Sequence, residues 1–124
     1  MAGKIKIRWS KGEVVAELKD TATAKKLLGS LPCEAQVNTW GEEVYFELPF
    51  SAELEADAQQ VVDPGTVCFW TKGSALALPF GPTPISKGDE CRLADKCNIL
   101  GKIIGDPRSL KSVKDGDSIE VSQL

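Results

Sequence analysis

Residues 67–86 decide the fold, and they read Val-Cys-Phe-Trp-Thr-Lys-Gly-Ser-Ala-Leu-Ala-Leu-Pro-Phe-Gly-Pro-Thr-Pro-Ile-Ser. The stretch contains two apolar runs, and each of them is too short to form a helix. The turn residues 71–74 join the two runs, and a proline-stiffened loop follows the second run. The pattern therefore predicts a buried pair of strands that leads to a rim.

Two aromatic residues, Phe69 and Trp70, are adjacent at the end of the first run. Neighbouring side chains of a strand point to opposite faces of the sheet. One of the two rings is therefore expected in the core, and the other on the outside or in a second cavity. This makes the stretch the best candidate for the wall of a binding site, although it indicates no reaction.

The flanking sequence predicts further short strands. Residues 4–9 alternate charged and apolar side chains, and with residues 13–18 they indicate a hairpin. Strands are also expected at 34–39, 43–48, 98–104 and 118–121, with Gly101 allowing a close backbone approach or a bulge. Residues 51–60 are expected to form a solvated acidic excursion, and residues 86–96 a loop.

Two short helices complete the prediction. Ala24, Leu27, Leu28 and Leu31 recur at the spacing of one helical face, and Asp20 or Thr21 is placed to cap its start. Asp106 and Pro107 indicate the N-cap and first position of a second helix. About eight strands, two short helices and no linker suit an all-β single domain over residues 1–124, built as a closed or nearly closed antiparallel barrel.

The composition excludes several classes of protein. A formal net charge of -3, from 18 acidic and 15 basic residues, argues against a nucleic-acid or anionic-membrane surface. The apolar runs are far shorter than the ~20 residues of a membrane-spanning helix. Residues 1–4 lead directly into a strand rather than into a signal-peptide core. We therefore expect a soluble cytoplasmic protein.

The four cysteines, Cys33, Cys68, Cys91 and Cys97, have no C-x-x-C spacing. Their pattern supports neither a zinc site nor a disulfide framework. We expect Cys33 and Cys68 to be small core residues, and Cys91 and Cys97 to be free thiols near a loop. No metal or other cofactor is predicted.

The chain contains no histidine, which excludes Ser-His-Asp and Cys-His catalysis and histidine metal sites. Glu42, Glu43 and Glu47 surround Trp40 and Tyr45, so one interpretation is a catalytic carboxylate beside aromatic rings. The alternation of residues 43–48 instead places Glu43 and Glu47 on the polar face of a strand, where charged side chains are expected. We prefer this second interpretation.

The tryptophans differ in their expected positions. Trp9 fits the core face of the first strand, whereas Trp40 and Trp70 lie next to turns and are expected at a rim. Aromatic side chains at strand ends form recognition pockets, but they also serve as lids on a core. Both roles remain open for Trp40 and Trp70.

Several segments resemble the cyclophilins. Residues 98–105, Asn-Ile-Leu-Gly-Lys-Ile-Ile-Gly, with 110–113, Leu-Lys-Ser-Val, are similar to the Val-Phe-Gly-Lys-Val segment of that family and its following short helix. Gly73-Ser74 before a strand resembles the family's Gly-Ser-Gln-Phe-Phe. Residues 40–49 and 80–86 look like signatures of small prokaryotic cyclophilin-like proteins without assigned function. The resemblance covers nearly the whole chain.

The resemblance implies an eight-stranded barrel, capped by two helices, with a groove that binds X-Pro peptides and accelerates their isomerisation. The cyclophilin donor is an arginine in a Phe-His-Arg motif, but residues 37–45 contain neither arginine nor histidine. Ala75, Leu76 and Ala77 stand where the family has glutamine and two phenylalanines. Arg92, in an expected loop, is the one arginine that is a candidate for a displaced donor at the groove.

We therefore predict a cyclophilin-like barrel that binds a small ligand or short peptide in an aromatic-lined cleft, without efficient prolyl isomerase activity. The residues expected to bind are Trp40, Tyr45, Phe69, Trp70 and Phe80. The alternatives are a prolyl isomerase that uses Arg92 as a displaced donor, and an interaction module whose exposed rings dock a protein partner or a second copy. The sequence leaves the oligomeric state open.

Overall fold

The computed structural model describes residues 3–124, and strands dominate it. The helices are α1 (Ala22–Ser30) and the 3-10 helix η1 (Pro107–Ser112). The strands are β1 (Gly3–Trp9), β2 (Gly12–Leu18), β3 (Cys33–Gln36), β4 (Asn38–Thr39), β5 (Glu43–Glu47), β6 (Gln59–Val62), β7 (Thr66–Trp70), β8 (Ala75–Pro79), β9 (Cys91–Ile104) and β10 (Ser118–Gln123). Neither helix within residues 3–124 is long and apolar enough to cross a membrane.

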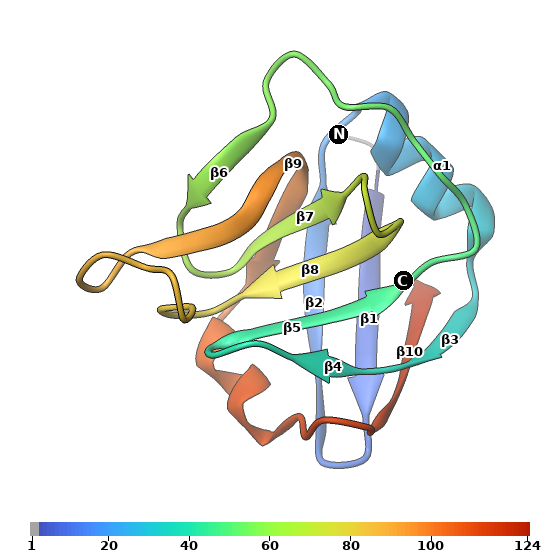
Figure 1. Cartoon of the computed structure of the whole chain (residues 1–124). Helices are drawn as coiled ribbons and strands as arrows, with labels where there is room; N and C mark the ends of the chain where they lie inside the picture. The colour runs from blue at the N-terminus through green and yellow to red at the C-terminus, as the bar shows by residue number, and fades with distance from the viewer. Residues whose placement is uncertain (1–2) are drawn as a thin grey trace.

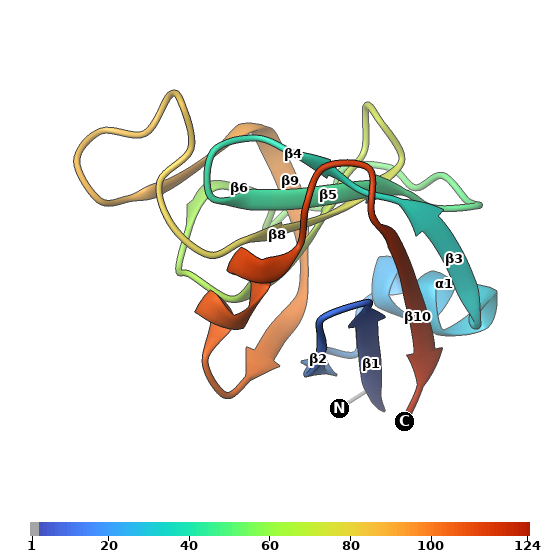
Figure 2. The ribbon, with the colours of Figure 1, turned by 90° about the horizontal axis from the view of Figure 1, so that it is seen from below.

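The strands form one antiparallel sheet in the order β3-β10-β1-β2-β9-β7-β8-β5-β4, and β6 pairs with β9 off this path. Figure 1 shows β8 and β5 crossing in front of β1 and β2, with β10 to the right of β1. The long strand β9 belongs to both groups, because it pairs with β2 on one side and with β7 on the other. The sheet therefore bends at β9 into two layers, which Figure 2 shows from below.

The sheet is not closed by hydrogen bonds. Its edges are β3 and β4, which are consecutive in the chain and separated by Val37. No ladder joins these two edges among the described residues. The predicted mainly-β antiparallel architecture is confirmed, but a closed eight-stranded barrel is not, since the structure has ten strands and a seam. Of the two predicted helices, the second is a 3-10 helix.

The main core lies between the two layers. Alternate residues of β7, β8 and β5 face inward, including Phe69, Leu76 and Phe46, and they meet Ile5 and Ile7 of β1. On the opposite side of the same three strands, Cys68 and Ala77 form a second apolar cluster with Leu93 and Cys97 of β9. Both faces of this part of the sheet are therefore covered.

Local sequence signals gave several elements correctly. The hairpin of β1 and β2 is present, and β7 pairs with β8 through the turn at 71–74. The Thr21 hydroxyl caps α1 by accepting a hydrogen bond from the Ala24 amide at 3.1 Å. The Asp106 carboxylate caps η1 by accepting from the Arg108 amide at 2.9 Å.

Two expectations were wrong. Residues 91–96 are the first part of β9 rather than a loop, and β6 lies within the segment beyond residue 51. Residues 53–55 are held against the sheet by the buried Asn98 side chain rather than freely solvated. Asn98 Nδ2 donates to the Glu53 carbonyl at 2.9 Å, and Asn98 Oδ1 accepts from the Glu55 backbone amide at 2.7 Å. Pairing between β6 and β9, which are distant in the sequence, stabilises these short polar strands and overrides local propensity.

Candidate functional site

A cavity of about 280 Å³ opens into the second apolar cluster. Three of its walls are aromatic side chains, and the remainder are one carboxylate, one thiol and small or aliphatic groups. The lining residues are Trp40, Glu43, Tyr45, Trp70, Ala77, Leu93, Ala94 and Cys97. Its volume lies just below the range that is usual for small-molecule sites, about 300–1,000 Å³.

Strand alternation directs these side chains to the same place. Val44 and Phe46 of β5 enter the main core, so Glu43 and Tyr45 point to the other face. The register places Tyr45 opposite Ala77, and Ala77 opposite Cys68. The small Ala77 side chain leaves space between Tyr45 and Trp70, while β9 covers that space with Leu93, Ala94 and Cys97.

Trp70 is held firmly at the cavity wall. Its ring meets that of Tyr45 edge to face, with centroids 6.3 Å apart and planes at 85°. The indole Nε1 donates to Asp95 Oδ2 at 3.1 Å, and Lys72 Nζ lies 3.3 Å from Asp95 Oδ1. Gly73 lies over the indole so closely that an added Cβ would be 2.5 Å from two ring carbons. The orientation of Trp70 is therefore fixed on several sides.

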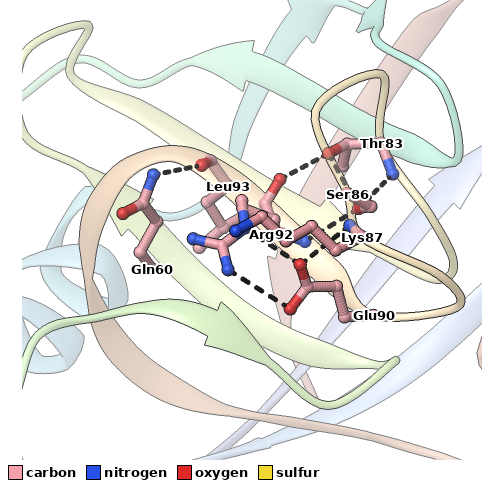
Figure 3. A network of polar contacts seen from close by, with 7 residues as sticks. All are labelled: Gln60, Thr83, Ser86, Lys87, Glu90, Arg92 and Leu93. Atoms are coloured by element: carbon pink, nitrogen blue, oxygen red, sulfur yellow. Dashed lines mark hydrogen bonds and ion pairs between the residues drawn. The ribbon is translucent and has the colours of Figure 1, made fainter.

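Trp40 is positioned by a turn that contacts the loop after β8. Its amide donates to the Glu43 carbonyl at 3.0 Å. Gly41 has a φ of +62°, and a Cβ there would come within 2.9 Å of the Thr83 backbone. The Thr83 hydroxyl donates to the Arg92 carbonyl, and the Thr83 amide donates to Ser86 Oγ at 2.8 Å, as Figure 3 shows.

Glu43 is the unexpected member of the site. Glu43 is 6% exposed, and its Oε1 has no hydrogen-bond partner among residues 3–124. Burial raises the pKa of this carboxyl from 4.5 to about 7. The expected solvated position was therefore wrong, because β9 covers the outer face of β5. The apolar residues on both faces of β7 and β8 are the sequence signal that this face is covered.

The cysteines are free thiols, and their positions differ in part from the prediction. Cys91 and Cys97 are buried on β9 rather than placed near a loop. Cys97 lines the cavity, and burial raises the pKa of its thiol to about 12. It is therefore a protonated, weakly polar part of the wall at neutral pH. Within residues 3–124, no cluster of side chains suits a metal ion.

The five residues predicted to bind ligand occupy three places. Trp40, Tyr45 and Trp70 line the cavity together. Phe69 is fully buried in the main core, where it stacks on Phe50 with centroids 5.1 Å apart. Phe80 lines a different hollow, beside Thr39 and Lys111. The cavity residues that the sequence prediction missed are Glu43, Ala77, Leu93, Ala94 and Cys97.

Arg92 is directed away from the cavity lining. Its Nε donates to Glu90 Oε1 at 2.9 Å, and its second guanidinium nitrogen lies 3.4 Å from Glu90 Oε2. Figure 3 shows this pair beside the loop that contains Thr83 and Ser86. The arginine thus organises a surface loop together with Glu90.

A larger hollow of about 780 Å³ follows the seam between β3, β4 and the end of β5. It is lined by residues such as Glu34, Gln36, Asn38 and Glu47, all of which are exposed, and by no aromatic ring. The smaller cavity is the better candidate site because it combines aromatic walls with a buried ionisable group.

Comparison with known proteins agrees with this architecture. Residues 3–122 match the family described as cyclophilin-like. The chain belongs to the cyclophilin-like family. It is also similar to a hypothetical protein from Archaeoglobus fulgidus whose solution structure is known, with 32% identity and a TM-score of 0.84 over 98% of this chain and 95% of the other. A comparison with curated proteins finds no match.

In this cyclophilin-like protein, the two segments that resemble family signatures contact each other beside the cavity. The Glu42 amide donates to the Pro82 carbonyl at 2.9 Å, and the Phe80 amide donates to the Glu42 carbonyl at 2.9 Å. An added Cβ at Gly81 would be 2.7 Å from Glu42 Oε1. These contacts hold the turn that carries Trp40 and lead directly into Glu43.

Proposed function

We propose that this cyclophilin-like protein binds a small ligand, or one side chain of a short peptide, in the cavity between β5, β8 and β9. The observation that carries the proposal is the meeting of Trp40, Tyr45 and Trp70 around a buried carboxyl group. Aromatic walls with a few polar groups are typical of sites that recognise small molecules. The unpaired Glu43 oxygen provides a polar contact that a ligand would satisfy.

Tryptophan fluorescence tests this proposal, because Trp40 and Trp70 line the cavity while Trp9 is 5% exposed and bonded to Ser112. Benzylamine and choline are suitable probes for this readout, and phenol and indole are titrated by calorimetry because they fluoresce themselves. We expect at least one probe to change the fluorescence saturably, and Trp70→Ala to weaken its binding by about tenfold or more, since an aromatic wall is lost.

Two glycine variants provide an indirect perturbation of Trp70 and its control. Gly73→Ala should also weaken probe binding, because its Cβ displaces the Trp70 ring without touching the ligand. Gly29→Ala is the matched control, since nothing lies within 4 Å of its added Cβ on the exposed side of α1. Absence of binding by every probe, or binding that is unchanged in Trp70→Ala, would contradict the proposal.

We further propose that the protein is not an efficient prolyl isomerase. Isomerisation is accelerated by a donor directed at the prolyl nitrogen, and the described residues that line the cavity include no arginine. Arg92, the displaced donor considered above, is paired with Glu90. A protease-coupled peptide assay should give the uncatalysed rate for the wild-type protein. Acceleration that is lost in Arg92→Ala would instead establish the enzyme alternative.

A further inference from the structure

We propose that the group bound in the cavity is an alkylated ammonium ion, whose positive charge contacts the aromatic walls and pairs with the Glu43 carboxylate. This inference rests on the proposed function of the cavity and specifies the class of its ligand. It follows from three features of the site: the arrangement of the rings, the sign of the charge on the wall, and the surroundings of Glu43.

The aromatic walls have the composition of a cation site. Trp40, Tyr45 and Trp70 line one small space, and the rings of Tyr45 and Trp70 stand at 85° to each other. Ammonium groups with alkyl substituents are attracted to the faces of such rings, most strongly to tryptophan. The Asp95 carboxylate accepts the Trp70 Nε1–H at 3.1 Å, which places negative charge at the edge of that indole.

Glu43 provides the matching charge. It is the one carboxylate, lysine or arginine side chain among the described residues that line the cavity. The other polar groups there are the Tyr45 hydroxyl, the Cys97 thiol and the indole N–H groups of the two tryptophans. Its Oε1 is buried without a protein partner. A buried carboxyl without a partner is costly to ionise, and a desolvated cation is the partner that removes this cost.

The elements around Glu43 add no competing cation to the wall. Cys97 and Cys91 on β9 and Cys68 on β7 are thiols whose pKa values are raised by burial, and the nearby acids are Glu42, Asp63 and Asp95. Lys72 lies 3.3 Å from Asp95, and Lys111 lies 3.7 Å from Glu42. Both lysines are thus paired with acids other than Glu43.

The direction of the pH dependence distinguishes a cation from a neutral ligand. Burial raises the pKa of Glu43 to about 7 in the free protein. A cation binds the ionised carboxylate and releases a proton, so its affinity should rise by about tenfold between about pH 6 and about pH 8. A neutral acceptor that uses the protonated carboxyl as a donor would bind more weakly as the pH rises.

Choline and dimethylbutanol, its neutral tert-butyl isostere, provide the test. Both are titrated into the wild-type protein and into Glu43→Gln, with tryptophan fluorescence as the readout and calorimetry for proton release. We expect choline to bind about tenfold more tightly than the isostere at about pH 8. Glu43→Gln should remove the pH dependence and reduce this preference to the part that the aromatic walls supply, whereas Glu47→Gln, at an exposed position of the same strand, should retain both.

A trimethyllysine dipeptide in the same titration separates a free ammonium ligand from one carried by a peptide. Binding of either choline or the dipeptide more tightly than the neutral isostere supports the inference. Equal binding of choline and its isostere, or choline affinity that falls as the pH rises, overturns it. If choline fails but phenol or indole binds in a Trp70-dependent manner, the ammonium inference is wrong and the proposed function stands. If no probe binds, both fail.

Discussion

The wild-type protein is expected to lose stability as the pH rises from 4.5 to about 7, and the Glu43→Gln variant is expected not to show this loss. Burial raises the folded-state pKa of this carboxyl above its unfolded value. Between the two values the unfolded chain releases the proton while the folded protein keeps it. The unfolded state is therefore favoured as the pH rises, and the free energy of unfolding falls through this window.

The expected magnitude is about 3 kcal/mol, because each pKa unit corresponds to about 1.4 kcal/mol. Glutamine has the shape of glutamate and does not titrate, so the variant lacks this contribution at every pH. Urea denaturation at about pH 4 and about pH 8 measures the change for both proteins. Subtracting the two changes isolates Glu43 from the other acids of the chain.

Glu47→Gln is the control for this experiment, since Glu47 is exposed on the same strand. Its pH profile should follow that of the wild-type protein. If Glu43→Gln also followed the wild-type profile, Glu43 would be solvated or paired in the folded protein. The cavity would then not hold a desolvated carboxyl group.

Gly101→Ala is expected to destabilise the fold by about 4 kcal/mol or more, which is beyond the usual cost of a single substitution. A Cβ at Gly101 would overlap the carbonyl oxygen of Glu17 and come within 2.9 Å of Leu18 Cα. Both contacts are to the backbone of β2, and β7 holds β9 from the other side through Val67. Neither neighbouring strand can move away without breaking its own ladder.

Thermal or urea unfolding measures this effect, with Gly29→Ala as the matched glycine-to-alanine change. Gly29 lies in α1 with open space around it, so alanine should stabilise the protein by about 1 kcal/mol through helix propensity. Equal stability of the Gly101→Ala and wild-type proteins would show that β2 and β9 are not in close contact at this position.

Much of the fold was predictable because its signals are local. The alternation in β1 and β2, the caps at Thr21 and Asp106, and the turn between β7 and β8 each depend on a few consecutive residues. Gly101 was likewise identified as a place of close approach, and the register between β7 and β9 also shifts beside it. Closure was not predictable, since it depends on whether β3 and β4 pair across the seam.

The site was predictable only in part, for a related reason. Alternation placed Phe69 and Trp70 on opposite faces, and the structure has Phe69 in the core and Trp70 on the cavity. The same rule placed Glu43 on the outer face of β5 but gave no information on what covers that face. The cover consists of the first part of β9, a polar segment whose strand conformation depends on pairing with β6.

The sequence by itself determined the family, the main strands and the aromatic residues available for a site, because these follow from short-range patterns and recognisable segments. The tertiary structure decided which of those residues meet, and it changed Glu43 from an expected surface charge into a buried carboxyl group. The physical reason is that the cost of a charge depends on its surroundings. Here strands distant in the sequence supply those surroundings.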